Sequence, residues 1–161
     1  MISNINYKGV VRVPLDRFKF SSTKPYQYIE KNKQYTILIF KSGACRIMGC
    51  RVPLKNNQLP YNIVLNCIQS ISLYTDYGRE INLYQLSKKA KSLYEPELFP
   101  ALRLLAFKPL CVNIFNSGKI TILGIRTLNF QKIINNIINY LKQCECELTG
   151  RDSTLSINSF I

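Results

Sequence analysis

The side chains in this sequence that could do chemistry are cations and aromatic rings rather than catalytic groups. Its 161 residues include 22 Lys and Arg, 10 Tyr and 8 Phe, but no histidine. Without histidine, the Ser–His and Cys–His pairs that activate a nucleophile cannot form. The six cysteines contain no C-x-x-C pair, so we predict reduced, mostly buried thiols and no structural zinc. We therefore expect no enzyme, no metal site and no cofactor.

The charge of the chain favours a polyanionic partner. Only 9 acidic residues oppose the 22 basic ones, which gives a formal net charge of +13. Such a charge attracts polyanions over long range, with nucleic acid as the first candidate and an anionic membrane surface as the second. No apolar run is long enough to span a bilayer, and residues 1–4 do not resemble the start of a secretion signal. We expect an intracellular protein with no membrane partner.

An internal repeat gives the first information on architecture. Residues 39–51 read IFKSGACRIMGCR and residues 114–126 read IFNSGKITILGIR, an offset of 75 positions. Each segment predicts a strand, a tight turn on Ser-Gly and a second strand. The positions shared by the two segments include Phe40/Phe115, Ser42/Ser117, Gly43/Gly118, Ile47/Ile122, Gly49/Gly124 and Arg51/Arg126.

Helices are predicted around these hairpins. Apolar residues recur at helical spacing over 130–141, namely Phe130, Ile133, Ile134, Ile137, Ile138 and Leu141. A second helix is expected over 61–68, after Pro60, and a third over 83–93. The polar tail from Gln143 is expected to be loosely attached. Consecutive strands with short turns predict an antiparallel sheet, with helices on one face and the other face free for solvent or a ligand.

The second half of the chain resembles the TATA-box-binding protein family. The residues that carry the resemblance are the run Tyr94-Glu95-Pro96-Glu97-Leu98-Phe99-Pro100, followed by Lys108-Pro109, Ile114-Phe115, Ser117-Gly118-Lys119 and Gly124-Ile125-Arg126. The resemblance extends over residues 2–142 and is most specific in the second half. It implies an α+β saddle, in which two quasi-repeats form a curved antiparallel sheet with helices on the convex face.

The same resemblance implies a division of the chain into a shortened first repeat (1–66), a second repeat (67–142) and a polar C-terminal tail (143–161). The first strands of the two repeats are offset by 66 positions and the hairpins by 75, so the first half lacks about nine residues. This internal count agrees with the shortening that the resemblance indicates.

In this family, pairs of phenylalanines insert between base steps in the DNA minor groove. Phe99 and Phe115 match the pair of the second repeat, and Phe40 matches one member of the pair of the first. The companion of Phe40 is expected near residues 22–24, where no phenylalanine stands, and Phe18 or Phe20 would need a shifted register. For each of these rings, packing in the core is the alternative interpretation.

The resemblance also assigns the positions that face base edges in the groove. Asn4 matches a base-reading asparagine, and Ser70 stands at its counterpart in the second repeat. Met48 and Leu123 replace two threonines of the family. Thr121 is also expected to lie among the residues that face the minor groove. Arg46 stands at a usually apolar position and is expected to point to the concave face, where it would either enter an A·T-rich groove or block docking.

Other charged residues match positions that contact phosphates or a protein partner. Arg51, Lys119 and Arg126 match basic positions beside the groove, and Arg103 and Lys108 lie near such positions. Glu95, Glu97 and Leu98 match residues by which the family contacts a transcription factor IIB-type protein. The alternatives are solvated surface charges and a turn motif that serves folding alone.

Two functions follow from these observations. The first is a DNA-binding general transcription initiation factor that bends A·T-rich double-stranded promoter DNA, recruits a IIB-type factor and serves the RNA polymerase machinery indirectly. The alternative is a protein-interaction subunit with little sequence-specific DNA binding of its own, completed by an additional subunit. We expect either protein to act in the nucleus, or in a cytoplasmic viral factory if the source is a large DNA virus.

Overall fold

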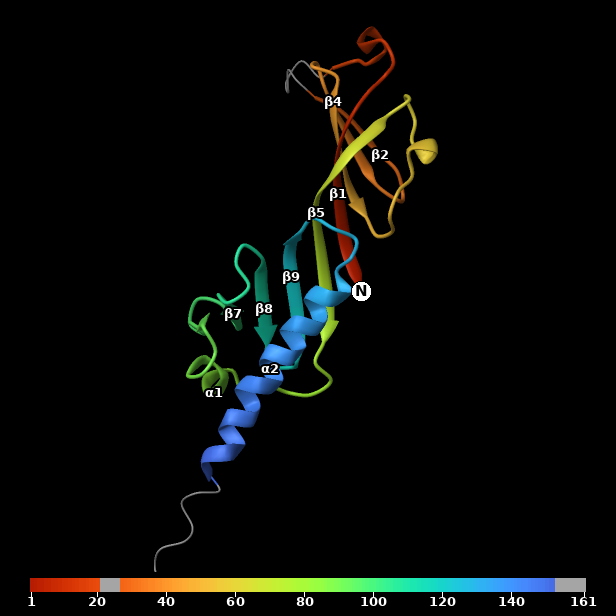
Figure 1. The fold of residues 1–161 in the computed structure, drawn as a ribbon. Helices are drawn as coiled ribbons and strands as arrows, with labels where there is room; N and C mark the ends of the chain where they lie inside the picture. Colours follow the sequence, from red (N-terminus) through yellow and green to blue (C-terminus); the bar gives the residue numbers. More distant parts are fainter. Residues whose placement is uncertain (21–26, 153–161) are drawn as a thin grey trace, which may run out of the picture. The chain divides into compact units, whose positions relative to one another are not determined.

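The computed structural model describes residues 1–20 and 27–152, with side chains described for residues 1–20 and 28–145. Their strands form one sheet in the order β2-β3-β4-β1-β5-β9-β8-β7-β6 (Figure 1). The strands are β1 Ile2–Val10, β2 Gln27–Lys31, β3 Thr36–Phe40, β4 Ala44–Cys50, β5 Val64–Asp76, β6 Ser92–Leu93, β7 Ala101–Leu104, β8 Cys111–Phe115 and β9 Lys119–Ile125. The α-helices are α1 Leu83–Ser87 and α2 Gln131–Asp152, and two 3-10 turns are η1 Leu15–Arg17 and η2 Asn56–Gln58. Every pairing whose register is described is antiparallel, as expected for this α+β fold.

The chain divides into two compact units. Unit 1 contains Met1–Leu73 together with Leu123–Thr127, and unit 2 contains Tyr74–Ile122 and the residues from Leu128 onward. The expected boundary between residues 66 and 67 lies inside β5, which both units share. None of the described helices is long and apolar enough to cross a membrane.

Unit 1 has its core on one face of its strands. Alternate residues of β1, β3 and β4 are buried there: Ile5, Tyr7, Ile37, Ile39, Cys45 and Ile47. Because side chains alternate across a strand, the residues between them face the other way. The segment from 51 to 63 covers the buried face, where Leu54 N donates to Tyr7 Oη at 3.1 Å and Ile63 is buried. Among the described residues of unit 1, this cover contains no α-helix.

The prediction of a helix over residues 61–68 is wrong. Tyr61 and Asn62 have φ of 59° and 49°, which turns the chain sharply before β5 begins at Val64. The Tyr61 ring packs edge-on against Phe18, with centroids 5.0 Å apart, and its hydroxyl donates to the Glu30 carboxylate. These contacts with distant residues, together with pairing of β5 to β1, outweigh the local helical signal.

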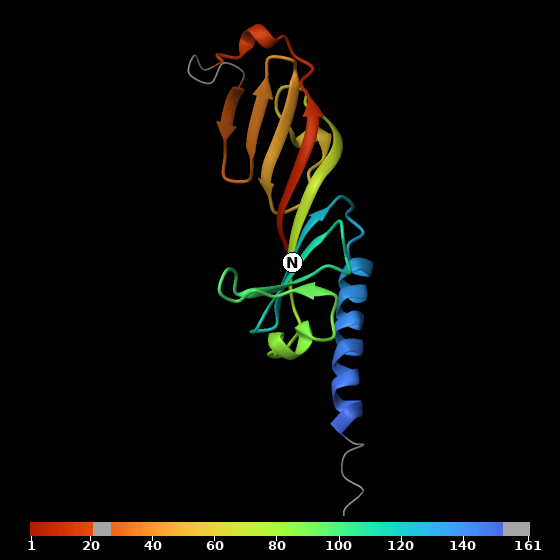
Figure 2. The same ribbon diagram turned by 90° about the vertical axis from the view of Figure 1, so that its left-hand side faces the viewer.

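Unit 2 has a true covering helix. Figures 1 and 2 show α2 lying along one side of the strands of this unit. Ile137 and Leu141 are buried, and the Tyr140 ring meets Phe107 edge-on with centroids 5.5 Å apart. The Tyr140 hydroxyl also accepts from Lys91 N at 3.0 Å. The predicted helix over 130–141 is confirmed.

The polar tail begins later than expected. Helix α2 continues to Asp152, so the expectation of a loose tail from Gln143 is wrong for its first ten residues. Cys144 continues the buried stripe one turn beyond Leu141. Glu145 accepts from Tyr77 Oη at 2.6 Å and forms an ion pair with Arg79. The rest of the expected tail lies outside the described residues.

The helix expected over 83–93 is confirmed only in its first part. Asn82 caps α1 by accepting from Gln85 N at 3.0 Å, and the helix ends at Ser87. Residues Ser92–Leu93 form β6 and pair with β7. The edge of the sheet thus satisfies backbone groups that a longer helix would have used internally.

The internal repeat is confirmed within each unit. In the hairpin turns, Gly43 N donates to Phe40 O and Gly118 N donates to Phe115 O, both at 2.9 Å. Each glycine has positive φ, 79° and 82° respectively. Each glycine carbonyl then accepts a bond from the end of the neighbouring strand, from Val11 N in unit 1 and from Tyr77 N in unit 2. The offsets of 75 and 66 positions are therefore both reproduced.

Candidate nucleic-acid interface

Two aromatic rings lie side by side in unit 2 on the face of the strands opposite the core. This face is called the strand face in both units. Phe115 ends β8 and pairs through its backbone with Ala101 of β7, while Phe99 comes just before β7. The ring centroids are 6.2 Å apart with an interplanar angle of 65°, and Phe99 is 41% exposed. Of the two interpretations of these rings, core packing does not fit Phe99. The pair has the size and exposure of an apolar wedge.

A tight turn places a second exposed group directly before Phe99. Leu98 N and Phe99 N both donate to Glu95 O, at 3.0 and 2.9 Å. This geometry leaves the Leu98 side chain 80% exposed, with the carboxylates of Glu95 and Glu97 also exposed. An exposed apolar side chain beside two carboxylates suits contact with a basic protein surface.

The strand face of unit 1 carries cations. Arg46 of β4 is exposed and lies in register between Lys8 of β1 and Leu38 of β3. Its guanidinium lies 6.0 Å from the centre of the Phe40 ring. Glu30 is the one carboxylate on the described strands of this unit, and its bond to Tyr61 holds it on the opposite face. Two like charges in register repel each other, so this face is electrostatically suited to an anion.

In unit 1, the described residues include only one member of the expected phenylalanine pair. Phe40 is partly exposed on the same face as Arg46. Its expected companion near residues 22–24 lies outside the described residues. Phe18 is buried among Phe20, Tyr28 and Tyr61, so it does not serve as a free wedge.

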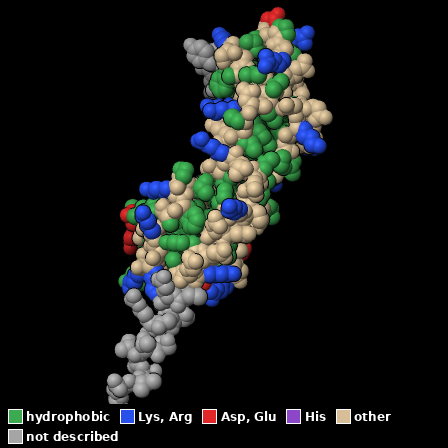
Figure 3. All heavy atoms as spheres, viewed as in Figure 1, with side chains coloured by type: hydrophobic (Ala, Val, Ile, Leu, Met, Phe, Trp, Pro, Cys, Tyr) green, Lys and Arg blue, Asp and Glu red, His purple; other side chains and the backbone are tan. Residues whose placement is uncertain are grey.

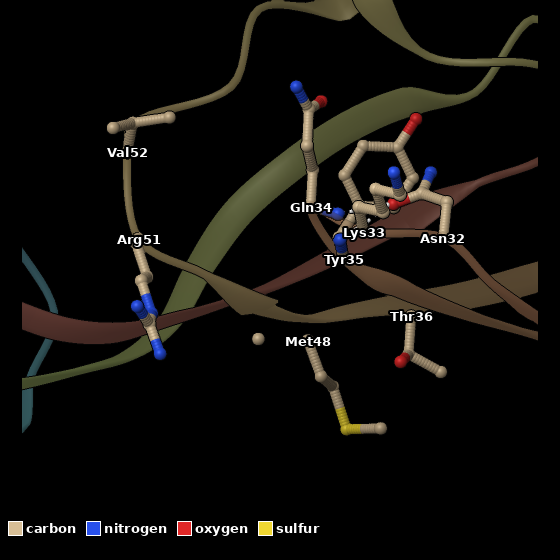
Figure 4. A pocket seen from close by; sticks show the side chains of 9 residues that line it. Asn32, Lys33, Gln34, Tyr35, Thr36, Met48, Arg51 and Val52 are labelled. Atoms are coloured by element: carbon tan, nitrogen blue, oxygen red, sulfur yellow. Dashed lines mark hydrogen bonds between the residues drawn. The ribbon is translucent and has the colours of Figure 1, made fainter.

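An open hollow of about 500 Å³ adjoins the strands of unit 1. Figure 4 shows that Thr36 and Met48 reach it from β3 and β4, and that Arg51 follows β4. Its lining residues are Asn32, Lys33, Gln34, Tyr35, Thr36, Met48, Gly49, Arg51 and Val52. The lining contains two cations and no carboxylate, so it is suited to a phosphate group rather than to a metal ion. No group of His, Cys, Asp and Glu able to hold a metal occurs among the described residues.

Comparison with known proteins agrees with this geometry. A family model described as transcription factor TFIID, or TATA-binding protein, matches residues 66–144. The TATA-box-binding protein of Methanococcus maripaludis strain C7 is 36% identical over 83 residues, and the chain spans about half of its length, 46%. The TATA-box-binding protein of strain S2 of the same organism is 36% identical over 128 residues, which cover 70% of this chain and 71% of that protein.

The chain belongs to the TATA-box-binding protein family. This is a family of transcription factors, as the description of its model states. A solved structure of Methanococcus jannaschii TBP agrees in fold, with a TM-score of 0.70 over 88% of this chain and 97% of that chain at 20% identity.

In this member of the TATA-box-binding protein family, the residues expected to face base edges are partly engaged in internal hydrogen bonds. Asn4 Oδ1 accepts from Gly49 N at 2.9 Å, while the Asn4 amide NH₂ is a hydrogen-bond donor. Ser70 Oγ accepts from Asn6 Nδ2 at 3.1 Å. Met48 is partly exposed on the face that carries Arg46. These positions therefore offer hydrogen-bond donors and apolar contact more than free acceptors.

The remaining residues expected to face base edges lie on β9. Thr121 is partly exposed, and Leu123 follows it by two positions and is exposed. Thr121 therefore stays a candidate polar contact beside an apolar one.

The predicted phosphate-binding residues fall into two groups. Arg51, Lys119 and Arg126 are exposed at or beside strand ends, and Lys108 is exposed in the turn between β7 and β8. Arg103 differs, because it lies in the middle of β7 and its Nε donates to Asn113 Oδ1 at 3.4 Å. In Figure 3, Lys and Arg side chains are spread widely over the surface of unit 1.

Sequence reasoning missed two residues of these faces, Lys8 and Asn113. Lys8 becomes relevant only through its register opposite Arg46. Asn113 stands two positions before Phe115, so the alternation of side chains along a strand would have placed it on the same face as Phe115.

The thiols differ strongly in their expected reactivity. Of the described cysteines, Cys45, Cys50 and Cys144 are buried, whereas Cys67 is exposed. Burial raises the pKa of Cys45 and of Cys50 to about 11, so their thiolates are scarce at pH 8. We expect iodoacetamide at pH 8 to label both at least about a hundredfold more slowly than Cys67. Peptide mapping by mass spectrometry measures this, and labelling in urea should equalise the sites; equal rates in the native protein would contradict the packing of β4.

Proposed function

We propose that this chain is a transcription initiation factor that binds and bends A·T-rich promoter DNA through the minor groove. The observation that carries the proposal is the pair Phe99 and Phe115, which lie side by side on the strand face of unit 2, with Phe99 exposed and Phe115 partly exposed. Burying such rings in the core would be more stable than exposing them, so their exposure favours a binding role. Insertion between base steps offers them an apolar environment while it kinks the duplex.

The charge distribution supports DNA as the ligand. Residues 1–66 contain 11 Lys and Arg against 2 Asp and Glu. On the strand face of unit 1, Lys8 and Arg46 stand in register without a facing carboxylate on the described strands. Cations that neutralise phosphates release condensed counterions, so binding should weaken steeply as salt rises.

The turn that carries Leu98 supports recruitment of a transcription factor IIB-type protein. Acidic residues are scarce in the chain, yet Glu95 and Glu97 lie beside a wedge that would approach DNA. Because carboxylates repel phosphates, a partner with basic side chains is the better reason for their position. We expect such a complex to form in the nucleus or in a viral factory.

A second candidate function is an interaction subunit that binds DNA without sequence preference. It is favoured by Met48 and Leu123, which place apolar atoms where the family has threonine, and by the internal bond to Ser70. This protein would contact a IIB-type factor through Glu95, Glu97 and Leu98 and would depend on another subunit to find its promoter.

The deciding experiment is a fluorescence-transfer bending assay on end-labelled A·T-rich and G·C-rich duplexes over a salt series. The promoter-factor proposal predicts a large change in transfer on the A·T-rich duplex, tighter binding to it, and affinity that falls steeply with salt. Binding that is equal on both duplexes and leaves them straight would contradict it and favour the interaction subunit. Adding a IIB-type protein tests whether that protein binds to the bent complex.

A further inference from the structure

One polar side chain on the strand face of unit 2 is buried. Asn113, in the centre of β8, is only 7% exposed and is the buried polar residue among the described part of the chain. Asparagine is disfavoured in strands, and burying an amide is costly unless it is hydrogen-bonded. Its side chain lies on the same face as Phe115, two positions further along β8.

The amide of Asn113 links three neighbouring strands through polar contacts. Arg103 Nε of β7 donates to Asn113 Oδ1 at 3.4 Å, and Asn113 Nδ2 donates to Thr121 Oγ1 of β9 at 3.4 Å. The Cys111 thiol approaches the same oxygen at 3.7 Å. All three contacts are longer than the usual hydrogen bond, so a ligand can replace them at low cost.

The corresponding positions of unit 1 are different. The hairpin offset of 75 makes Leu38 the equivalent of Asn113 and Arg46 the equivalent of Thr121. In β2, Ile29 pairs with Leu38 as Arg103 pairs with Asn113. Unit 1 therefore presents two apolar side chains where unit 2 presents a guanidinium and an amide.

We propose that Arg103, Asn113 and Thr121 form a polar base-reading site that admits a G·C pair beside the Phe99–Phe115 wedge. This inference rests on the proposed minor-groove function. In the minor groove an A·T pair shows only acceptors, while a G·C pair adds the guanine N2 amino group, a donor. An apolar face would strip water from that amino group without replacing its hydrogen bond. Asn113 Oδ1 and Thr121 Oγ1 supply acceptors for it, and the Arg103 guanidinium donates to the neighbouring base acceptors.

The site predicts an asymmetric preference along the DNA. A G·C pair is tolerated in the half of the recognised sequence that unit 2 covers. It is rejected in the half that unit 1 covers, where Ile29 and Leu38 offer no acceptor. The same asymmetry gives the protein one preferred orientation on an otherwise near-symmetric site.

The test is a competition-binding scan with A·T-rich duplexes that carry one G·C or one inosine·C pair at each position. Inosine lacks only the N2 amino group. For the wild type we expect a position in one half where G·C binds within about threefold of A·T. In Asn113→Leu, G·C at that position should bind about tenfold more weakly, while inosine·C and A·T stay within about twofold. Thr121→Val, which keeps the shape of the side chain, should give a smaller loss of the same kind.

Each outcome separates this inference from the proposed function. If the wild type binds and bends the A·T duplex but Asn113→Leu leaves the G·C position unchanged, the reading site is overturned and the function stands. Equal penalties for G·C and inosine·C would overturn it as well. Failure of the wild type to bind any duplex would overturn both. Thermal melting of the variants verifies that each is folded before it is scanned.

Discussion

Replacing both Phe99 and Phe115 by alanine is expected to abolish DNA bending. The two rings form an aromatic pair on the strand face of unit 2, and their centroids lie 6.2 Å apart. Unstacking a base step costs a few kcal/mol, and the inserted rings provide the offsetting contact. Without them the duplex should stay straight, and affinity for the A·T-rich duplex should fall by about 3 kcal/mol, roughly a hundredfold.

The measurement is the transfer efficiency of the end-labelled duplex at saturating protein. Residual binding by the double variant should be equal on A·T-rich and G·C-rich duplexes and steeply salt-dependent, because cations alone then hold the DNA. Leu98→Ala is the matched control, since it truncates an even more exposed apolar residue next to Phe99 and should leave the bend unchanged. A double variant that bends DNA as the wild type does would show that the wedge lies elsewhere.

Replacing Gly118 by alanine is expected to destabilise the protein severely. A Cβ at this position would lie 2.1 Å from the backbone oxygen of Arg79, and Gly118 has a φ of +82°. The clash is with backbone, which is itself held by the bond from Tyr77 N to Gly118 O and by the ion pair of Arg79 with Glu145. We expect a loss of at least about 3 kcal/mol in the free energy of unfolding.

The internal repeat provides the control for this substitution. Gly43 occupies the same turn of unit 1 with a φ of +79°, but the nearest atom to its added Cβ is the Leu15 side chain, 3.9 Å away. Gly43→Ala should therefore cost only the backbone strain, about 1 kcal/mol. Urea unfolding followed by circular dichroism compares the two variants. Equal losses would mean that the close approach of Arg79 does not constrain the turn.

The two repeats differ in the side chains that they present to a ligand. Unit 2 has the aromatic pair, the exposed Leu98 and a polar strand face. Unit 1 has the cationic pair Lys8 and Arg46 on its strands. In the proposed function, the first repeat therefore contributes mainly charge, whereas the second contributes kinking, base selection and partner contact.

The sequence by itself determined the hairpins, the long helix, the family and the absence of a histidine-based catalytic pair. These features are local: Ser-Gly with positive φ encodes each turn, and apolar residues at helical spacing encode α2. The place of Phe115 at the end of β8 was predictable from the hairpin motif, whereas Phe99 was singled out by the resemblance to the family. The C-terminal limit of α2 was misjudged, as were the extent of α1 and the helix expected over 61–68.

The tertiary structure alone decided the features that depend on register between distant strands. The turn at Tyr61 exists because its ring and hydroxyl find Phe18 and Glu30, far away in the chain. Arg103 became a strand-face residue because its strand pairs with that of Asn113. A shift of one residue in a strand would reverse the face of every side chain, and the sequence of one strand does not show which residues of a strand distant in the chain it will pair with. Packing against the rest of the protein selects it.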